Sequence, residues 1–233
     1  MKKKWPYGKN LPLSALLLCI FTVLVIYCFY QSYFGEFPDF EGVVSPIGNV
    51  PITITWVTHF HALMIMAWLL MLIVQPILIL KKQLNWHRLL GKISYGLVAL
   101  MILSFVLIVR QEQLREKSLP VFASNLLDPI VFVVMYGLAI YYRKKPAYHA
   151  RFMVMTIIGF VGPAFARIQG PALETIFALF ALFLLLEWRT RKIYTPYLIS
   201  LGYYVTHLGS VAYLFFGNQA LLDSIWHFFF GKG

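Results

Sequence analysis

The sequence predicts an all-α integral membrane protein, a seven-transmembrane-helix bundle with a cytoplasmic N-terminus and its C-terminus outside. Three observations lead to this prediction. Of the 233 residues, 60% are hydrophobic and only 12% are charged, which is less charge than a soluble domain of this length carries. Apolar runs long enough to cross a bilayer recur along the whole chain. The basic residues lie in short clusters between these runs, where they specify membrane topology.

The first half of the chain predicts three helices. The first, at residues 11–30, follows a lysine-rich N-terminus. It has the charge layout of a signal peptide but is of spanning length and lacks a clear small-residue cleavage site, so we expect an uncleaved helix. Acidic residues, prolines and glycines then predict a loop. The second helix is expected at residues 52–80 and the third at residues 86–110, followed by a mixed-charge loop at residues 111–119.

The second half predicts four more helices and a tail, so that residues 1–233 form a single membrane domain. The fourth helix is expected at residues 120–142 and the fifth at residues 147–168, on either side of a sharp basic turn. The sixth is expected at residues 171–188 and the seventh at residues 194–216. The tail at residues 218–233 contains a Trp and three consecutive Phe. It is too short to span a bilayer and is predicted to lie at the membrane interface.

The distribution of the basic residues predicts the orientation. Fifteen of them lie at the N-terminus or after the second, fourth and sixth helices. The other five lie on the opposite side: Arg110, Arg115, Lys117, Arg167 and Lys232. Because cytoplasmic loops carry the excess of Lys and Arg, the N-terminus is predicted to be cytoplasmic. Topology thus accounts for the formal net charge of +11, and we expect a lipid bilayer, not nucleic acid, as the partner.

Ionisable side chains within the spans indicate a functional site, because they are costly there. The main candidates are His61, Asp128, Arg167, Glu174 and His207. At 1.5 Å per helical residue, His61, Asp128 and His207 lie about 12–13 Å from the outer ends of their helices. Helical geometry places His61 on one face with Trp68 and Gln75, which predicts that this face points into the bundle. His59 lies two residues before His61, about 200° around the helix axis, and is predicted to point to the interface or to lipid.

Haem binding is the leading functional prediction. Haem needs two axial ligands that face each other across a bundle, typically His. His61 and His207, at matched depth, are predicted to hold one haem b in the outer half of the membrane. The second-to-third and fourth-to-fifth connections each have a basic cluster before an aromatic-His pair. This similarity predicts that His87 and His149 hold a second haem near the cytoplasm, which would complete an electron path with quinone as one candidate acceptor. The alternative for this inner pair is contact with lipid phosphate.

Two other interpretations remain open. In the first, His61, His207 and Asp128 bind zinc and leave a fourth position for water, which the metal activates for hydrolysis of a lipid. No H-E-x-x-H motif supports it, and Asp128 has the ordinary structural alternative of pairing with Arg167. In the second, no cofactor binds. The polar cluster then binds a small ligand, passes protons or joins helices, with Glu174 pairing with Arg167, in an assembly or transport subunit of a larger membrane complex.

One stretch resembles a known family. The segment H-A-L-M-I-M-A-W at 61–68 resembles the second-helix motif of the two-haem, cytochrome b-type transmembrane reductases. The tripeptide W-H-R at 86–88 resembles the start of the next helix in that family. This resemblance covers residues 58–92 and implies haem ligation by His61, His87 and His149. The family has its ligands on four consecutive helices, whereas the fourth helix here offers Asp128, which leaves His207 as the remaining candidate.

The chain as a whole resembles a group of uncharacterised bacterial multi-pass membrane proteins. They share a His-containing helix that ends in Gln-Pro, a turn similar to L-H-R-x-L-G-K, and a basic turn before Y-H-A-R-F-M. The corresponding residues here are 75–76, 86–92 and 143–153. The resemblance covers about two-thirds of the chain and implies a location in the bacterial cytoplasmic (inner) membrane.

Overall fold

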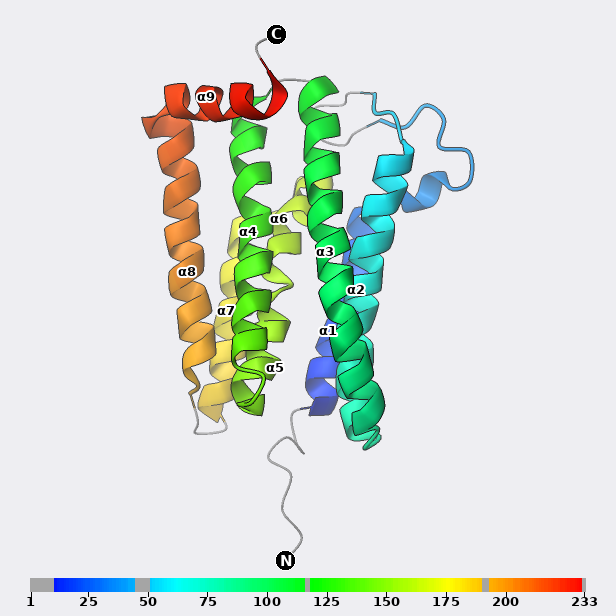
Figure 1. The fold of residues 1–233 in the computed structure, drawn as a ribbon, viewed down its shortest axis with the longest axis vertical. Helices are drawn as coiled ribbons and strands as arrows, with labels where there is room; N and C mark the ends of the chain where they lie inside the picture. The colour runs from blue at the N-terminus through cyan, green and yellow to red at the C-terminus, as the bar shows by residue number, and fades with distance from the viewer. Residues whose placement is uncertain (1–10, 45–50, 116–117, 190–192, 232–233) are drawn as a thin grey trace, which may run out of the picture. The chain divides into compact units, whose positions relative to one another are not determined.

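The structure is a computed structural model that describes residues 11–44, 51–115, 118–189 and 193–231. Over these ranges the chain is helical, and its β-structure is limited to an isolated bridge between Val44 and Pro51 (Figure 1). The predicted all-α class is confirmed. Five segments are long and apolar enough to cross a membrane: Trp56–Leu80, Leu84–Arg115, Val121–Tyr141, Pro146–Arg167 and Thr195–Gly217.

Each of the seven segments predicted to be helical is helical in the structure. The α-helices are α1 (Leu11–Cys28), α2 (Trp56–Leu80), α3 (Leu84–Arg115), α4 (Leu119–Tyr141), α5 (Pro146–Met155), α6 (Ile158–Arg167), α7 (Ala172–Arg189), α8 (Thr195–Ala212) and α9 (Gln219–Phe230). The short 3₁₀-helix η1 covers Phe34–Glu36, and the π-turn η2 covers Tyr213–Gly217. The basic residues expected at the N-terminus lie outside the described residues, as do two of those in the α7–α8 connection.

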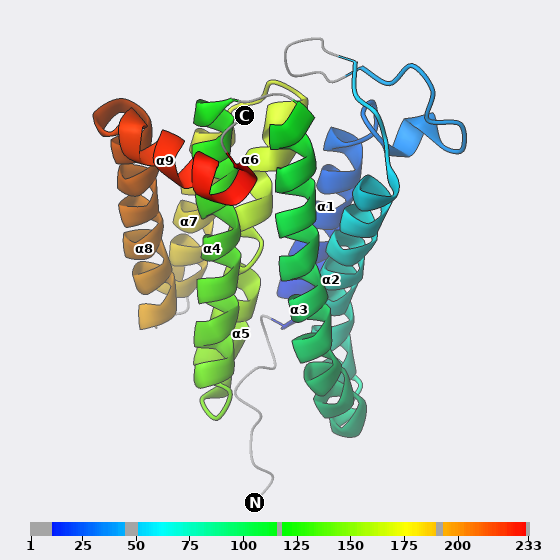
Figure 2. The same ribbon diagram turned by 45° about the horizontal axis from the view of Figure 1, so that its top comes forward.

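The chain divides into two compact units. Unit 1 contains Met1–Ser104 and Arg167–Gln169, and unit 2 contains Phe105–Ala166 and Gly170–Gly233. The predicted single membrane domain stays a prediction. In unit 1, α1 packs against α2. In unit 2, α4 packs against α5, α8 and α9, and α8 also packs against α5 and α7. Figure 2 shows α9 lying across the ends of α4 and α8. The interfacial location of this tail stays a prediction.

The start of α2 and the end of α3 differ from the prediction for local reasons. Helix α2 begins at Trp56, four residues later than expected, because Thr55 caps it: its hydroxyl oxygen accepts a hydrogen bond from the Val57 N–H at 3.2 Å, and Thr58 completes a capping box. This reciprocal cap fixes a helix start. Helix α3 continues to Arg115, through part of the predicted loop. The Arg115 guanidinium pairs with Glu112 at 2.7 Å, three residues earlier, which supports the last helical turn.

The predicted fifth helix is interrupted. It divides into α5 and α6, with a break at Thr156 and Ile157. The Thr156 hydroxyl donates to the carbonyl oxygen of Met153 at 2.7 Å, and its backbone N–H bonds to the same oxygen at 3.3 Å. Such side-chain bonding to the preceding turn competes with regular helix geometry. The break therefore lies in the middle of the segment Pro146–Arg167, which is long enough to cross a membrane.

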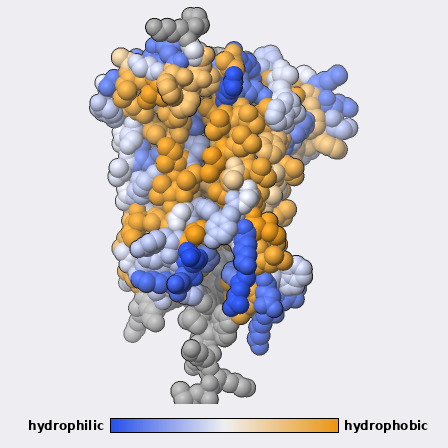
Figure 3. Space-filling view, in the orientation of Figure 1, coloured by the Kyte–Doolittle hydropathy of each residue, from blue (hydrophilic) through white to orange (hydrophobic). Residues whose placement is uncertain are grey.

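The apolar and hydrophilic residues on the surface are distributed as expected for helices in lipid. Figure 3 shows apolar residues over the middle of the helices and hydrophilic residues gathered towards their ends. Large apolar side chains such as Leu63, Leu70, Val106, Leu198 and Val205 are exposed along the spans. A water-soluble protein rarely exposes contiguous apolar surface of this kind. The structure therefore supports contact with a lipid bilayer.

Candidate functional site

Asp128 and His207 form a hydrogen-bonded pair in unit 2. The Nε2 atom of His207, in α8, lies 2.9 Å from the Oδ1 atom of Asp128, in α4. The side chain of His207 is 5% exposed and that of Asp128 is 30% exposed. Both residues belong to candidate membrane spans. They are among the site residues predicted from the sequence, and the structure brings these two into contact.

The backbone beside Asp128 is interrupted and has little side-chain bulk. The α5–α6 break lies just before Gly159 and Gly162. A Cβ atom at Gly159 would lie 3.5 Å from the Asp128 carbonyl oxygen, and one at Gly162 would lie 3.8 Å from its Oδ2 atom. These distances place Gly159 beside the backbone of Asp128 and Gly162 beside its carboxylate. Interrupted helices beside ionisable groups form the ion sites of many secondary transporters.

Buried polar side chains continue from His207 along one face of α8. They recur every three or four residues, and they are Tyr197, Ser200, Tyr204 and His207, each between 2% and 8% exposed. Residues at this spacing share one helix face. The rings of Tyr204 and His207 stack with centroids 5.6 Å apart. The Ser200 hydroxyl lies 2.8 Å from the Pro196 carbonyl oxygen and 3.2 Å from the Met135 sulfur, so this face, the α8 polar face, packs on α4.

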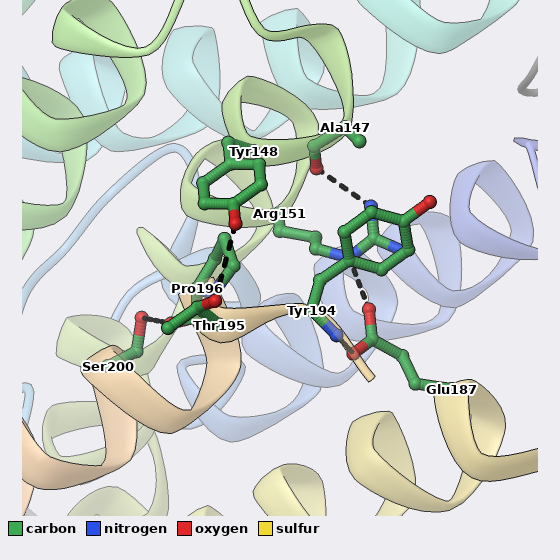
Figure 4. Close-up of polar contacts among 8 residues, drawn as sticks. All are labelled: Ala147, Tyr148, Arg151, Glu187, Tyr194, Thr195, Pro196 and Ser200. Atoms are coloured by element: carbon green, nitrogen blue, oxygen red, sulfur yellow. Dashed lines mark hydrogen bonds and ion pairs between the residues drawn. The ribbon is translucent and has the colours of Figure 1, made fainter. Parts of the chain in front are cut away.

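A buried ion pair lies at the other end of the α8 polar face (Figure 4). The Nε atom of Arg151, in α5, donates to the Glu187 carboxylate at the end of α7. The guanidinium carbon lies 3.7 Å from the ring centroid of Tyr194 and 5.8 Å from that of Tyr197. The other Glu187 oxygen accepts a hydrogen bond from the Tyr194 N–H at 2.7 Å. The Glu187 side chain is only 5% exposed, so this carboxylate joins three helices.

Glu187 was not predicted from the sequence to be a site residue. The alternative predicted for His149 was contact with lipid phosphate beside Arg151. In the structure Arg151 is held by Glu187 and by the Ala147 carbonyl oxygen, the latter at 2.7 Å. The sequence does contain an indication of this role, because Glu187 is a carboxylate at the end of an apolar run, next to a basic cluster. An acidic residue in that position suggests a buried partner for one of the cations.

The predicted inward face of α2 is confirmed in unit 1. Met64, Trp68, Leu72 and Gln75 are buried, whereas Leu63, Leu70 and Val74 are exposed. The Nδ1 atom of His61 lies 3.1 Å from the Ser104 hydroxyl of α3. Gln75 reaches the other end of the same helix pair, where its side-chain amide donates to the His87 carbonyl oxygen at 3.4 Å. His61 and Gln75 therefore each link α2 to α3 through a hydrogen-bond contact.

His59 has aromatic neighbours from the loop before α2. Its Nδ1 atom lies 2.8 Å from the Tyr33 hydroxyl, and the Phe40 ring meets it edge-on with centroids 4.8 Å apart. Burial raises the pKa of the Tyr33 phenol above its ordinary value. His59 itself is exposed, in agreement with the outward direction predicted from helical geometry. This loop contact was not predicted.

The remaining predicted haem ligands occupy defined positions, but their pairing is untested. The Nδ1 atom of His149 lies 2.8 Å from the Ala139 carbonyl oxygen, across the basic turn. His87 begins α3 in unit 1, whereas His149 belongs to unit 2. His61 and His207 are divided between the units in the same way. Both haem pairings therefore stay predictions.

Arg167 and Glu174 are the last two predicted site residues. The guanidinium of Arg167 lies 5.1 Å from the Phe29 ring centroid in unit 1. Glu174 is exposed in the first turn of α7, in unit 2. Within the described ranges, no group of three or more His, Cys, Asp and Glu side chains lies close enough together to hold a metal ion. The zinc interpretation has a contact between two of its three ligands, Asp128 and His207, and no further support.

The comparisons with known proteins identify no relative. No protein-family model matches this chain, and no curated protein or solved structure is significantly similar to it.

Proposed function

We propose that this chain is a cofactor-free transport subunit of a membrane complex that transfers protons, with the Asp128–His207 pair as its proton-binding site. The observation that carries the proposal is the 2.9 Å contact between these two side chains inside candidate membrane spans. An ionised Asp and a neutral His together carry one negative charge, and uptake of a proton makes the pair neutral.

The surroundings of the pair support proton transfer over a purely structural role. The α5–α6 break and the two glycines bring backbone close to the carboxylate, as at the ion sites of transporters with interrupted helices. The α8 polar face leads from His207 towards the Arg151–Glu187 pair. Tyr and Ser hydroxyls both donate and accept hydrogen bonds, so they can relay a proton together with bridging water.

The proposal includes seven membrane crossings with the N-terminus in the cytoplasm. Five crossings have candidate spans. The other two are α1 and α7, each of 18 residues, and a helix of that length covers about 27 Å, close to the thickness of the hydrocarbon core. The excess of basic residues after α2, α4 and α7 supports the orientation. The bacterial cytoplasmic membrane remains the expected location.

Proton flux into proteoliposomes tests the proposed function. A potassium diffusion potential drives protons into vesicles that contain the full chain, and an internal pH-sensitive dye reports their uptake. We expect Asp128→Asn and His207→Gln each to reduce the flux to the level of empty vesicles. The matched control is the pair in α9, which lies outside the candidate membrane spans and in which His227 Nε2 lies 3.3 Å from Asp223 Oδ2. Asp223→Asn should leave the flux unchanged, and an unchanged flux in Asp128→Asn would overturn the proposal.

Haem binding is the second candidate, and one observation favours it. His61 and His149 each have Nδ1 at hydrogen-bond distance from an oxygen, that of Ser104 or of Ala139. In haem and metal sites this contact commonly orients the ring so that Nε2 serves as the ligand. The fit is poorer at His207, whose Nε2 is held by Asp128. With haem bound, the site would supply electron transfer, to quinone or another acceptor.

A spectrum separates the two candidates. If haem binds, the reduced-minus-oxidised absorption spectrum of protein from haem-replete cells shows sharp low-spin bands, and extraction recovers haem in proportion to chain. His61→Ala and His149→Ala should then each diminish the bands. A flat spectrum would eliminate the haem candidate and leave the proton site unaffected.

A further inference from the structure

The turn between α4 and α5 combines three consecutive cations with tyrosine rings. Arg143, Lys144 and Lys145 are all exposed, and together with Tyr141 and Tyr142 they line an open hollow of about 480 Å³. No ion pair among the described residues involves any of these three cations. The hollow therefore presents concentrated positive charge with no carboxylate to neutralise it.

Contacts within the turn hold its cations in place. The Lys145 ammonium lies 5.6 Å from the ring centroid of Tyr142 and 5.7 Å from that of Tyr148, within the range of cation–π attraction. The Tyr148 hydroxyl lies 3.3 Å from that of Thr195, at the start of α8. One guanidinium N–H of Arg143 donates to the Ile140 carbonyl oxygen at 3.2 Å. A guanidinium has five N–H donors, so others can still reach an anion.

The position of the turn identifies the kind of anion. It joins Val121–Tyr141 to Pro146–Arg167, both candidate membrane spans, so it lies where a bilayer has its headgroups. Tyr141 is 75% exposed at the end of its helix, and tyrosines at such ends lie at the membrane interface. Basic hollows between spans bind the phosphates of anionic lipids. We propose that the Arg143–Lys145 turn binds the phosphate of an anionic phospholipid.

The corresponding turn of unit 1 provides a contrast within the same chain. The hollow there has a volume of about 300 Å³ and is lined by Lys82, Gln83, Leu84, Asn85 and Trp86. It has one cation in its lining instead of three. We therefore assign the lipid site to the α4–α5 turn, and the α2–α3 turn serves as the matched control. The proposed site does not involve Asp128 or His207, and its test is independent of proton flux.

Native mass spectrometry of the full chain in mild detergent tests the proposal, with phosphatidylglycerol and phosphatidylcholine offered separately. Wild type should retain phosphatidylglycerol in preference to phosphatidylcholine. Combined Arg143→Gln, Lys144→Gln and Lys145→Gln should reduce this retention by roughly fivefold or more, which is about the contribution of one basic residue at an anionic surface. The control, with Lys81→Gln, Lys82→Gln and Arg88→Gln combined, should retain the lipid like wild type. Equal retention by both triple variants would overturn the proposal.

Two further measurements use wild-type protein alone. The first tests the proposal if the triple variant misfolds, and the second distinguishes a lipid phosphate from free phosphate. If the first triple variant does not fold, wild type alone suffices, because its preference for phosphatidylglycerol should disappear in high salt. A preference that persists in high salt would contradict a charge-based site. Phosphatidylglycerol should also raise the melting temperature of lipid-depleted wild type, whereas millimolar sodium phosphate should not. Full stabilisation by phosphate alone would indicate a site for the free anion instead of a lipid.

Discussion

The guanidinium of Arg151 is held by the carboxylate of Glu187 and covered by the ring of Tyr194, so one buried charge pair connects α5, the end of α7 and the start of α8. The Arg151 side chain is 19% exposed and that of Glu187 is 5% exposed. Removing one partner of a buried pair leaves the other charge uncompensated. These residues therefore offer the clearest stability test in unit 2.

We expect Glu187→Gln to destabilise the protein by about 3 kcal/mol or more, the usual effect of breaking a buried pair. The midpoint of unfolding in mixed detergent micelles measures it. Glu174→Gln is the matched control, because it removes an exposed carboxylate from the same helix, and such surface changes have effects within about 0.5 kcal/mol. Equal effects of the two substitutions would show that Glu187 is not buried against Arg151.

The α8 polar face predicts a difference between two neighbouring tyrosines. Tyr204 stacks on His207, whereas Tyr203 lies one helical step away, about 100° around the axis. If the face relays protons, Tyr204→Phe should reduce proton flux on the order of tenfold, because it removes a hydroxyl positioned for transfer. Tyr203→Phe should have little effect. Equal flux in the two variants would argue that Tyr204 only packs against the histidine.

Substitutions at Gly162 test how much space lies between α6 and the Asp128 carboxylate. The Cβ atom of an alanine there would lie at ordinary contact distance, 3.8 Å, from the carboxylate oxygen. Gly162→Ala should therefore preserve proton flux and stabilise α6 by about 0.5–1 kcal/mol, since alanine favours a helix over glycine. Gly162→Leu should displace the carboxylate and match Asp128→Asn in proton flux. If leucine were tolerated as well as alanine, α6 could not lie close to Asp128.

The contact between Tyr33 and His59 predicts a pH-dependent loop. Burial raises the pKa of the Tyr33 phenol, so the neutral phenol is favoured when the loop is packed. The stabilisation is fully present below about pH 10, the pKa of a free phenol, and is lost as the pH rises through the higher value of the folded state. Cleavage of the loop by an alkali-tolerant protease should therefore increase above that pH.

Tyr33→Phe provides the control for this loop. It removes the 2.8 Å contact with His59, which should cost about 1 kcal/mol, and it also removes the titrating group. Cleavage should be faster than in wild type at neutral pH and should lack the alkaline increase that Tyr33 causes. An identical alkaline increase in both proteins would assign it to another group.

The sequence predicted the fold well because its evidence is local. Apolar runs and basic turns located each helical segment to within a few residues, and the face of His61 followed from helical geometry. The break at Thr156 was missed because its apolar neighbours resemble an ordinary span. The late start of α2 depends on Thr55 and Thr58 bonding reciprocally, and this cap was overlooked although both residues are visible in the sequence.

The candidate site was harder to predict because it depends on which helices are neighbours. Asp128 was grouped with His61 and His207 as a candidate zinc ligand and was also given Arg167 as a possible partner, and the structure has Asp128 in contact with His207. His61 was predicted at the same depth as a partner of His207. A single sequence does not show which helices are neighbours, so it does not decide whether His61 or Asp128 contacts His207. Glu187 was missed for a related reason, since its partner Arg151 is 36 residues away.

The packing of α9 has a consequence for α4, the helix that carries Asp128. Leu222 and Trp226 of α9 are buried against Phe122 and Ala123 of α4, and Phe122 precedes Asp128 by fewer than two helical turns. Phe228 lies on the opposite side of α9, and 83% of its surface is exposed. Displacement of α9 would therefore expose Phe122 and Ala123 and remove packing from the helix that carries the Asp128 carboxylate.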